Sequence, residues 1–232
     1  MEWNKYIEKH ARGIGAGIYW YAMQEIEDRR VVLLKGAKNK AVANLNYALN
    51  GWISSLQYRY NSAGNIGGGN GLIALNNDGS NTTTEPYLNS GGSNISSGYY
   101  ASGAYTQGSL GTTADSNGGG LMIDAGSDTT TKTTSGMGGL VSLIADSNYI
   151  SNEGLNANNQ VQISGYFNAG TLGASGTNTN VGELGLVYQN GSRALLTRLS
   201  VADNENLGAG NGTLVSINND YPAVFTMILS TF

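Results

Sequence analysis

Cysteine is absent from this chain of 232 residues, so the sequence excludes a disulfide framework and a thiolate zinc site. The single histidine, His10, is expected at the surface, and no Ser-His-Asp or Cys-His catalytic system can be assembled around it. No run of eighteen apolar residues occurs, so a membrane-spanning helix is not expected. The first residues, MEWNKYIEKHARG, lack the basic segment and apolar core of a secretory signal.

Charge and proline are also scarce. Charged residues make up 12% of the chain, about half the usual share, and there are only two prolines. Glycine, by contrast, accounts for 35 residues, roughly twice the average, and asparagine, serine and threonine fill much of the rest. This composition predicts many strands joined by turns, with surfaces that are polar through amides and hydroxyls.

The sign of the net charge changes near residue 61. Residues 1–60 hold nine of the twelve Lys and Arg residues and five acids, a balance of +4, whereas residues 61–232 hold three basic residues and eleven acids, a balance of −8. Glycine follows the same division, with five before the boundary and thirty after it. We therefore predict a helical N-terminal segment for attachment or oligomerisation over 1–60 and a β-sandwich over 61–232.

An apolar stripe predicts a helix over residues 37–60. Its members step by three or four positions across two heptads, and they are Val42, Leu45, Leu49, Trp52 and Leu56. Such a helix could pack on its own domain or on a neighbouring subunit, and the sequence leaves both alternatives open. In the second case these five side chains form an interface.

The segment before this stripe, GIYWYAMQEIEDRRVVLLKG, is ambiguous between helix and strand. Tyr19 and Trp20 can lie on a helix, whereas RRVVLLKG also fits a short strand, because four consecutive apolar residues reveal no period. Tyrosine and tryptophan bury a large area while keeping a polar tip, so Tyr19 and Trp20 are candidate interface anchors. Packing in the core of the chain's own domain is the equal alternative.

Beyond residue 61, short apolar islands separated by turn residues predict strands. The clearest are GGLVSLIAD, NQVQISGYF, GELGLVY, RALLTRLSV, GTLVSI and AVFTMILSTF, which recur about every ten residues. This spacing is typical of a mainly β fold, an antiparallel β-sandwich with the jelly roll as one form of it.

A hairpin is predicted around Asn190-Gly191, because a type I′ turn needs positive φ at both central positions. A two-residue turn pairs Gln189 with Ser192 and, counting back along both strands, sets Glu183 directly opposite Arg198. These two charges would then form a structural cross-strand pair.

Three further patterns carry little functional chemistry. Residues 74–85 match a calcium-loop template at Asn76, Asp78, Gly79 and Glu85, but position 1 is Ala74 and no flanking helices are evident, so a turn is favoured. Three acids fall in Gly-rich segments, where local caps are more common than a paired-acid site: Asp115, Asp124 and Asp128. The small net charge of the basic N-terminal part does not favour direct contact with nucleic acid. We expect no enzyme activity, no cofactor and no metal.

The C-terminal stretch VGELGLVYQNGSRALLTRLSVAD, followed by GTLVSINNDYPAVFTMILSTF, resembles the end of many structural proteins of tailed-phage virions. The matching positions are Glu183, Gly185, Leu186 and Arg198, and the likeness covers about fifty residues. The resemblance implies a non-enzymatic virion component of the tail, fibre or collar, with head decoration or the neck as the alternative. The loops rich in Tyr, Asn and Ser, such as SSGYYASGAYTQG, could stack on sugars and leave a carbohydrate-binding receptor module as the competing class. The resemblance also implies copies of itself and other virion proteins as partners, a host surface glycan as a further candidate, and assembly in the host cytoplasm.

Overall fold

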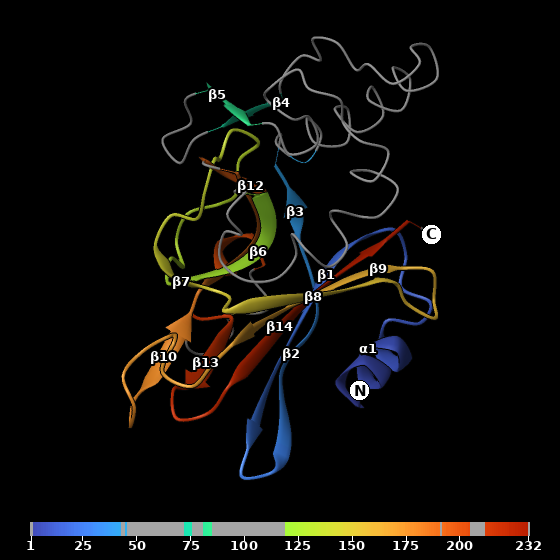
Figure 1. The fold of residues 1–232 in the computed structure, drawn as a ribbon, viewed down its shortest axis with the longest axis vertical. Helices are drawn as coiled ribbons and strands as arrows, with labels where there is room; N and C mark the ends of the chain where they lie inside the picture. Colours follow the sequence, from blue (N-terminus) through green and yellow to red (C-terminus); the bar gives the residue numbers. More distant parts are fainter. Residues whose placement is uncertain are drawn as a thin grey trace.

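The computed structural model describes residues 2–42, 45, 72–75, 81–84, 119–190, 192–204 and 212–231, and its ribbon is drawn in Figure 1. Its largest elements are two antiparallel sheets of five strands each. The first sheet has the strand order β2-β1-β14-β9-β8, with β2 over Arg29–Lys38, β1 over Gly17–Ile26, β14 over Ala223–Ser230, β9 over Val161–Phe167 and β8 over Tyr149–Leu155.

The second sheet has the order β3-β12-β11-β6-β7, with β3 over Lys40–Ala41, β12 over Ser192–Ser200, β11 over Glu183–Asn190, β6 over Gly119–Gly126 and β7 over Leu143–Asp146. Two small sheets pair β10 (Asn178–Val181) with β13 (Val215–Asn218) and β4 (Leu72–Leu75) with β5 (Asn81–Thr84). The described part also contains helix α1 over Glu2–His10 and a 3-10 turn, η2, over Val201–Asp203. Within these ranges no helix has the length and apolarity needed to span a membrane.

The two large sheets share one hydrophobic core. Alternate residues of β1 and β14, such as Trp20, Ala22 and Phe225, face Ile123 and Leu184 from the second sheet. Phe167 and Phe225 meet edge to face with their ring centroids 5.2 Å apart, a favoured aromatic geometry. The predicted mainly β fold, an antiparallel sandwich with a helical N-terminal element, is confirmed.

One glycine sets how closely the two sheets approach. A Cβ added at Gly165 on β9 would lie 2.7 Å from the Cβ of Ile123 on β6, so no side chain fits between the strands. We expect Gly165→Ala to lower the free energy of unfolding by about 1–3 kcal/mol, as overpacking of a core does. Chemical denaturation measures the change, and Gly15→Ala, where an added Cβ meets nothing within 4 Å, is the matched control. Equal stability of the two variants would contradict this account.

The N-terminal residues form strands of the sandwich itself, which corrects the predicted division of the chain. β1 lies between β2 and the C-terminal strand β14, with Trp20 paired to Met227, and β3 pairs with β12 in the second sheet. The helix expected over 37–60 is therefore wrong for residues 37–41, and 46–60 lie outside the described residues. The boundary near residue 61 does not separate residues 17–41 from the β-sandwich.

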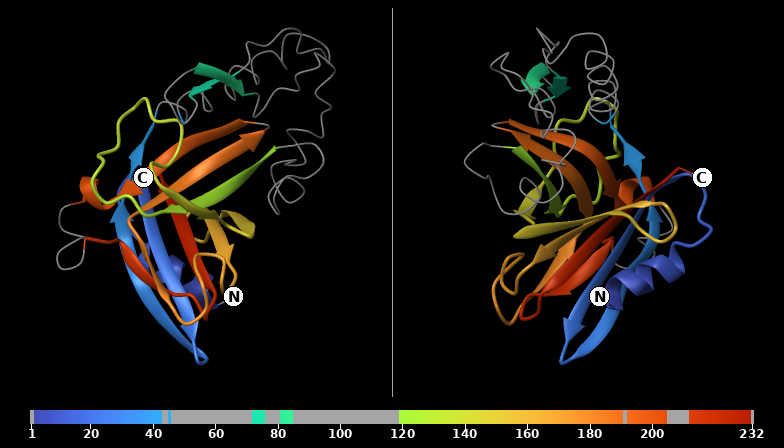
Figure 2. Two further views of the ribbon diagram at one scale, coloured as in Figure 1. Left: turned by 90° about the vertical axis from the view of Figure 1, so that its left-hand side faces the viewer. Right: turned by 45° about the vertical axis from the view of Figure 1, so that its right-hand side comes forward.

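The β1–β2 hairpin also resolves the ambiguous segment in favour of strands. Its two-residue turn is Glu27-Asp28, with φ of 47° and 61°, and positive φ at both positions is what a type I′ turn requires. The turn lacks the Asn-Gly signature, which is why the sequence did not reveal the hairpin. In Figures 1 and 2 this hairpin reaches beyond the neighbouring strands at the end of the molecule opposite β3.

Helix α1 covers the outer face of the first sheet. Its buried residues Trp3 and Ile7 pack on Tyr21, Met23 and Ile228 in a second hydrophobic cluster. Polar contacts fix the docking: the indole nitrogen of Trp3 donates to Thr226 Oγ1 at 2.9 Å, and Gln162 Nε2 donates to Asn4 Oδ1 at 2.9 Å. A helix of nine residues is marginal alone, so this packing is what stabilises it.

Candidate functional site

The predicted interface anchors do not form an exposed interface. The Trp20 side chain is fully buried in the main core, and Val42 is buried with Leu140, Val187 and Leu195, so the interface prediction is wrong for both. Tyr19 is half-buried beside α1, and its hydroxyl donates to the carbonyl of Gly15 at 3.1 Å.

Leu45 also packs against the main core, as a partly buried residue. The other three members of the predicted stripe, Leu49, Trp52 and Leu56, lie outside the described residues. The two described members of the stripe, Val42 and Leu45, therefore pack within the chain's own domain.

Glu183 and Arg198 form an ion pair, although the predicted register is wrong. Glu183 lies opposite Ser200 and Arg198 opposite Gly185. At the turn the register differs from the predicted one by one position, because Gln189 pairs with Arg193 rather than with Ser192. An irregularity between Leu186 and Val187 shifts the register by a second position. Because side chains alternate with period two, a shift of two positions keeps both residues on the same face of the sheet.

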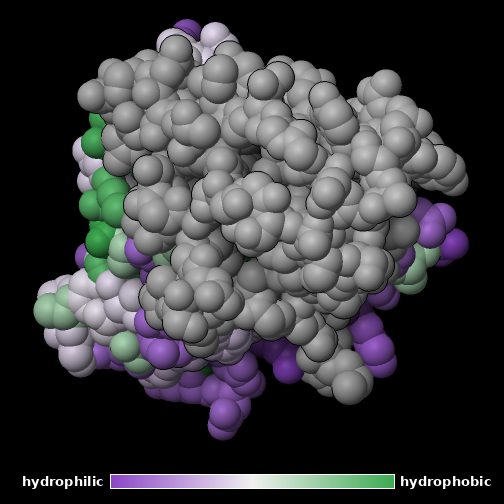
Figure 3. All heavy atoms as spheres, turned by 45° about the horizontal axis from the view of Figure 1, so that its top comes forward, coloured by the Kyte–Doolittle hydropathy of each residue, from purple (hydrophilic) through white to green (hydrophobic). Residues whose placement is uncertain are grey.

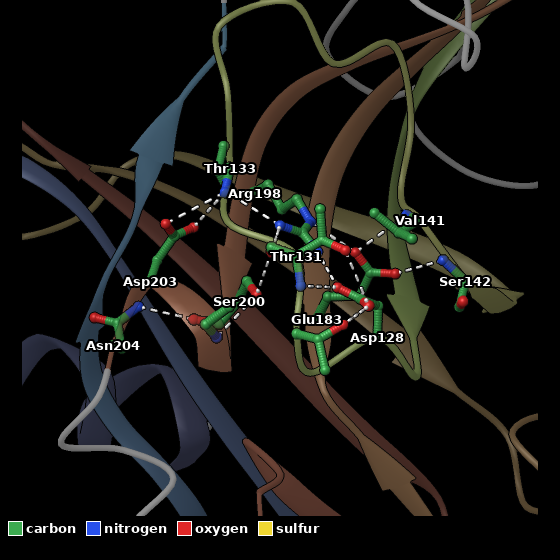
Figure 4. Close-up of polar contacts among 12 residues, drawn as sticks. Asp128, Thr131, Thr133, Val141, Ser142, Glu183, Arg198, Ser200, Asp203 and Asn204 are labelled. Atoms are coloured by element: carbon green, nitrogen blue, oxygen red, sulfur yellow. Dashed lines mark hydrogen bonds and ion pairs between the residues drawn. The ribbon is translucent and has the colours of Figure 1, made fainter.

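Arg198 is the centre of a buried charge cluster, shown in Figure 4. Its Nε donates to Glu183 Oε2 at 2.6 Å and its Nη2 to Asp128 Oδ2 at 2.9 Å, while Nη1 donates to the carbonyl of Thr131 and the hydroxyl of Thr133. The side chains of Arg198 and Glu183 are fully buried. All three guanidinium nitrogens are thus engaged, which is the condition under which a buried arginine is tolerated.

The cluster fastens the segment between β6 and β7, residues 127–142, which we call the strap. Asp128 and the two threonines bonded to Arg198 lie at its start. At its other end, the backbone N–H groups of Val141 and Ser142 donate to the two oxygens of Glu183 at 3.2 and 2.7 Å. The charge pair on β11 and β12 therefore holds the strap across the outer face of the second sheet.

A neighbouring carboxylate extends the cluster to the first strand of the second sheet. Asp203, in η2, accepts hydrogen bonds from the backbone N–H of Thr133 at 3.2 and 3.1 Å and from Lys40 Nζ at 2.8 Å. Lys40 belongs to β3, so this carboxylate links the strap to β3. The Lys40 side chain is 55% exposed, which makes this the weaker of the two attachments.

The surroundings lower the pKa of two carboxyls in the cluster. Burial alone would raise the pKa of Asp128, but hydrogen bonds from Thr131 and Thr130 and the charge of Arg198 outweigh it, and the pKa is lowered. At Asp203 burial is likewise outweighed, by hydrogen bonds from Lys40 and Thr133, so its pKa is also lowered. Both groups are therefore bound more strongly as carboxylates than as acids.

These shifts predict acid sensitivity. Between the folded and the unfolded pKa the unfolded state binds more protons, so stability rises with pH in that range. We expect the free energy of unfolding to fall as the pH drops below about 4, where unfolded aspartate becomes protonated. Urea denaturation at a series of pH values measures this, and Asp128→Asn should reduce the slope. An unchanged slope in the variant would contradict the assignment.

The cluster is chemically closed. Every guanidinium nitrogen of Arg198 and both oxygens of Glu183 are occupied by protein groups, so no position is directed at a substrate. Sequence reasoning found the two central charges, and it identified Asp128 as a local cap, which the hydrogen bond from the Thr131 N–H confirms; it missed the ion pair of Asp128 with Arg198, Asp203 and the strap. The available signal was the run SDTTTKTT, in which Asp and Thr are typical of turns closed by side-chain hydrogen bonds.

The described residues also offer little support for the metal and histidine sites considered from the sequence. No group of three or more His, Cys, Asp or Glu side chains there could hold a metal ion. Strands β4 and β5 overlap the calcium-loop template of 74–85, and its candidate ligands Asn76, Asp78 and Glu85, like Asp115, lie outside the described residues. His10 stacks on Tyr6, with centroids 3.9 Å apart, and its Nδ1 contacts the carbonyl of Tyr6 at 2.8 Å.

The described surface exposes few large hydrophobic side chains. Figure 3 shows largely hydrophilic residues beside a hydrophobic strip along one side of the face it draws. Over the whole described surface, those more than a third exposed are Val31, Val32, Val141, Leu143 and Tyr149. Val31 and Val32 lie on the edge strand β2, where a partner strand could reach the backbone.

Comparison with protein-family models, with curated proteins and with solved structures finds no match for this chain.

Proposed function

We propose that this chain is a non-enzymatic structural component of a tailed-phage virion, in the tail, fibre or collar, with head decoration or the neck as the alternative location. In this role the β-sandwich is a rigid module that assembles with its own copies and with other virion proteins. Phage particles are symmetric, so several copies would be present in each.

The observation that carries the proposal is that the motif residues are architectural. Glu183 and Arg198 are the buried pair that fastens the strap. Leu186 is a core residue, and a Cβ added at Gly185 would lie 2.7 Å from Leu195 Cδ1, so a larger residue there would displace the buried Leu195 side chain. A likeness made of framework positions fits a family of assembly proteins better than a family of enzymes.

The clamped strap also supports a structural role. A buried, fully hydrogen-bonded ionic cluster contributes conformational specificity more than stability, and here it fixes a sixteen-residue segment (127–142) in one path over the sheet. A particle component presents the same surface in every copy, and a fixed strap serves that requirement.

Two measurements test the proposal. Portal, tail-tube or capsid genes should neighbour the reading frame, and mass spectrometry of purified particles should find this chain at a stoichiometry of several copies per particle. Immunogold labelling of the same particles then distinguishes tail from head. A chain recovered only from the particle-free lysate, beside genes unrelated to virion assembly, would overturn the proposal.

A further inference from the structure

Two tyrosines stack on each other at the edge of the first sheet. Tyr149 begins β8, which is the last strand of that sheet (Figure 1), and it lies directly opposite Tyr166 of β9. The two ring centroids are 4.4 Å apart, and the ring planes differ by 8°. Because directly opposed residues project from the same face of a sheet, both phenol rings extend from the outer face, which α1 covers in part.

The two rings differ in what surrounds them. Tyr166 is half-buried and packs against the hydrophobic cluster beneath α1, which contains Trp3 and Val224. Tyr149 is 45% exposed. The protein therefore holds one ring in position, while a reagent in solution reaches the other, and a radical formed on Tyr149 is in contact with a second phenol.

Contact between two phenols allows one specific oxidation. Loss of one electron and of the hydroxyl proton converts a tyrosine into a neutral phenoxyl radical, whose unpaired electron is shared with the ring carbons ortho to the oxygen. Two such radicals on touching rings form a carbon–carbon bond between ortho carbons. Each ring then transfers the hydrogen of its bonded carbon to its oxygen, which restores two phenols joined as dityrosine. In total two electrons pass to the oxidant and two protons pass to water.

We propose that Tyr149 and Tyr166 form an oxidative cross-linking site, at which a one-electron oxidant of the peroxidase type, a ferryl haem generated by hydrogen peroxide, joins the two rings. The composition of the chain favours coupling. These 232 residues contain no cysteine, whose thiol is readily oxidised and would compete for the radical.

The link has a defined effect on the fold. It closes residues 150–165 into a covalent loop and fastens the edge strand β8 to β9, whose ladder is irregular between Asn152 and Gly154. In the chain-entropy model a covalent link stabilises a fold by restricting the unfolded chain, so the linked protein should unfold at a higher urea concentration than the unlinked protein.

Treatment of the full chain with a haem peroxidase and limiting hydrogen peroxide tests the site, at a low protein concentration that keeps links between copies rare. We expect an intact mass lower by two hydrogen atoms, together with the fluorescence of dityrosine. Glu153 lies between the two tyrosines in the sequence, so a protease that cleaves after glutamate under denaturing conditions releases them on separate peptides. Mass spectrometry should find these two peptides joined, and fragmentation should place the bond at Tyr149 and Tyr166.

Single substitutions identify the reacting groups. Tyr149→Phe and Tyr166→Phe each keep an aromatic ring in the stack but remove the phenol, so each should abolish the joined peptides. Tyr221→Phe is the matched control, because it removes the same hydroxyl at a half-buried position between β13 and β14 and should cross-link as the wild-type chain does. Circular dichroism verifies that each variant is folded.

Three outcomes would overturn the proposal: an undiminished yield of joined peptides from Tyr149→Phe, a bond that joins other tyrosines in place of this pair, or wild-type rings that gain oxygen without joining. In the last case the stack serves packing alone. The site depends only on β8 and β9, so these outcomes do not bear on the place of the chain in a virion, and absence from particles would not bear on the cross-link.

Discussion

A variant that lacks residues 1–60 is expected to remain unfolded. The deletion removes α1, β1, β2 and β3, so β14 loses its neighbour β1, and the fully buried Trp20 is lost with its neighbours in both hydrophobic clusters. Loss of Trp20 alone is expected to lower the free energy of unfolding by about 3–5 kcal/mol, as for other buried tryptophans, which is a large part of the stability of an ordinary domain. Circular dichroism and thermal denaturation should find no cooperative transition.

A smaller deletion provides the control. Removing residues 2–10 takes away α1 but leaves every described strand and the main core in place. This variant should unfold cooperatively at a lower denaturant concentration, because the sheet face beneath Trp3 and Ile7 is then exposed to water. A deletion of 1–60 that unfolds cooperatively would mean that β1 is dispensable, and the N-terminal segment would again be a candidate for attachment.

Local sequence signals were sufficient for the C-terminal strands but not for the N-terminal ones. In β14, Phe225 and Met227 face the main core, whereas the alternating Val224 and Ile228 pack in the cluster under α1, and that period is visible in the sequence. β1 has the same alternation in space, yet Trp20 pairs with Met227, which is 207 positions away in the chain. A short apolar run does not identify so distant a partner, and the helical stripe that begins at Val42 competed with the strand reading.

The candidate site was likewise predicted from the sequence only in part. The pairing of Glu183 with Arg198 followed from two strands joined by a short turn, and it tolerated an error of two positions because the alternation of side chains is preserved. The contribution of Asp128 depends on the path of the strap, which places a carboxylate seventy positions from Arg198 within 2.9 Å of it. Contacts of that separation leave no periodic signal in the sequence.

Arg198→Met is expected to lower the free energy of unfolding by about 3–5 kcal/mol, the usual result of removing one partner from a buried ion pair. The substitution leaves Glu183 buried without its counter-ion and close to the carboxylate of Asp128, while the carbonyl of Thr131 loses its charged donor. Arg198→Lys should recover only part of the loss, because a single ammonium group cannot reach the partners that three guanidinium nitrogens reach. Urea denaturation at neutral pH measures each variant, and the exposed Arg12→Met, expected to change stability by less than about 0.5 kcal/mol, is the control.

A double-mutant cycle separates the pair from the strap. If Arg198 acts mainly by neutralising Glu183, then Glu183→Gln combined with Arg198→Met should cost less than the sum of the two single changes, because no uncompensated charge is left on β11. The difference should be about 1–3 kcal/mol, within the range for residues of one network. Amide hydrogen exchange in the strap gives an independent readout, since the N–H groups of Val141 and Ser142 are bonded to Glu183 and should lose protection in both single variants. Additive energies together with unchanged protection at these two amides would contradict the role assigned to the pair, and would leave the strap held by its own hydrogen bonds alone.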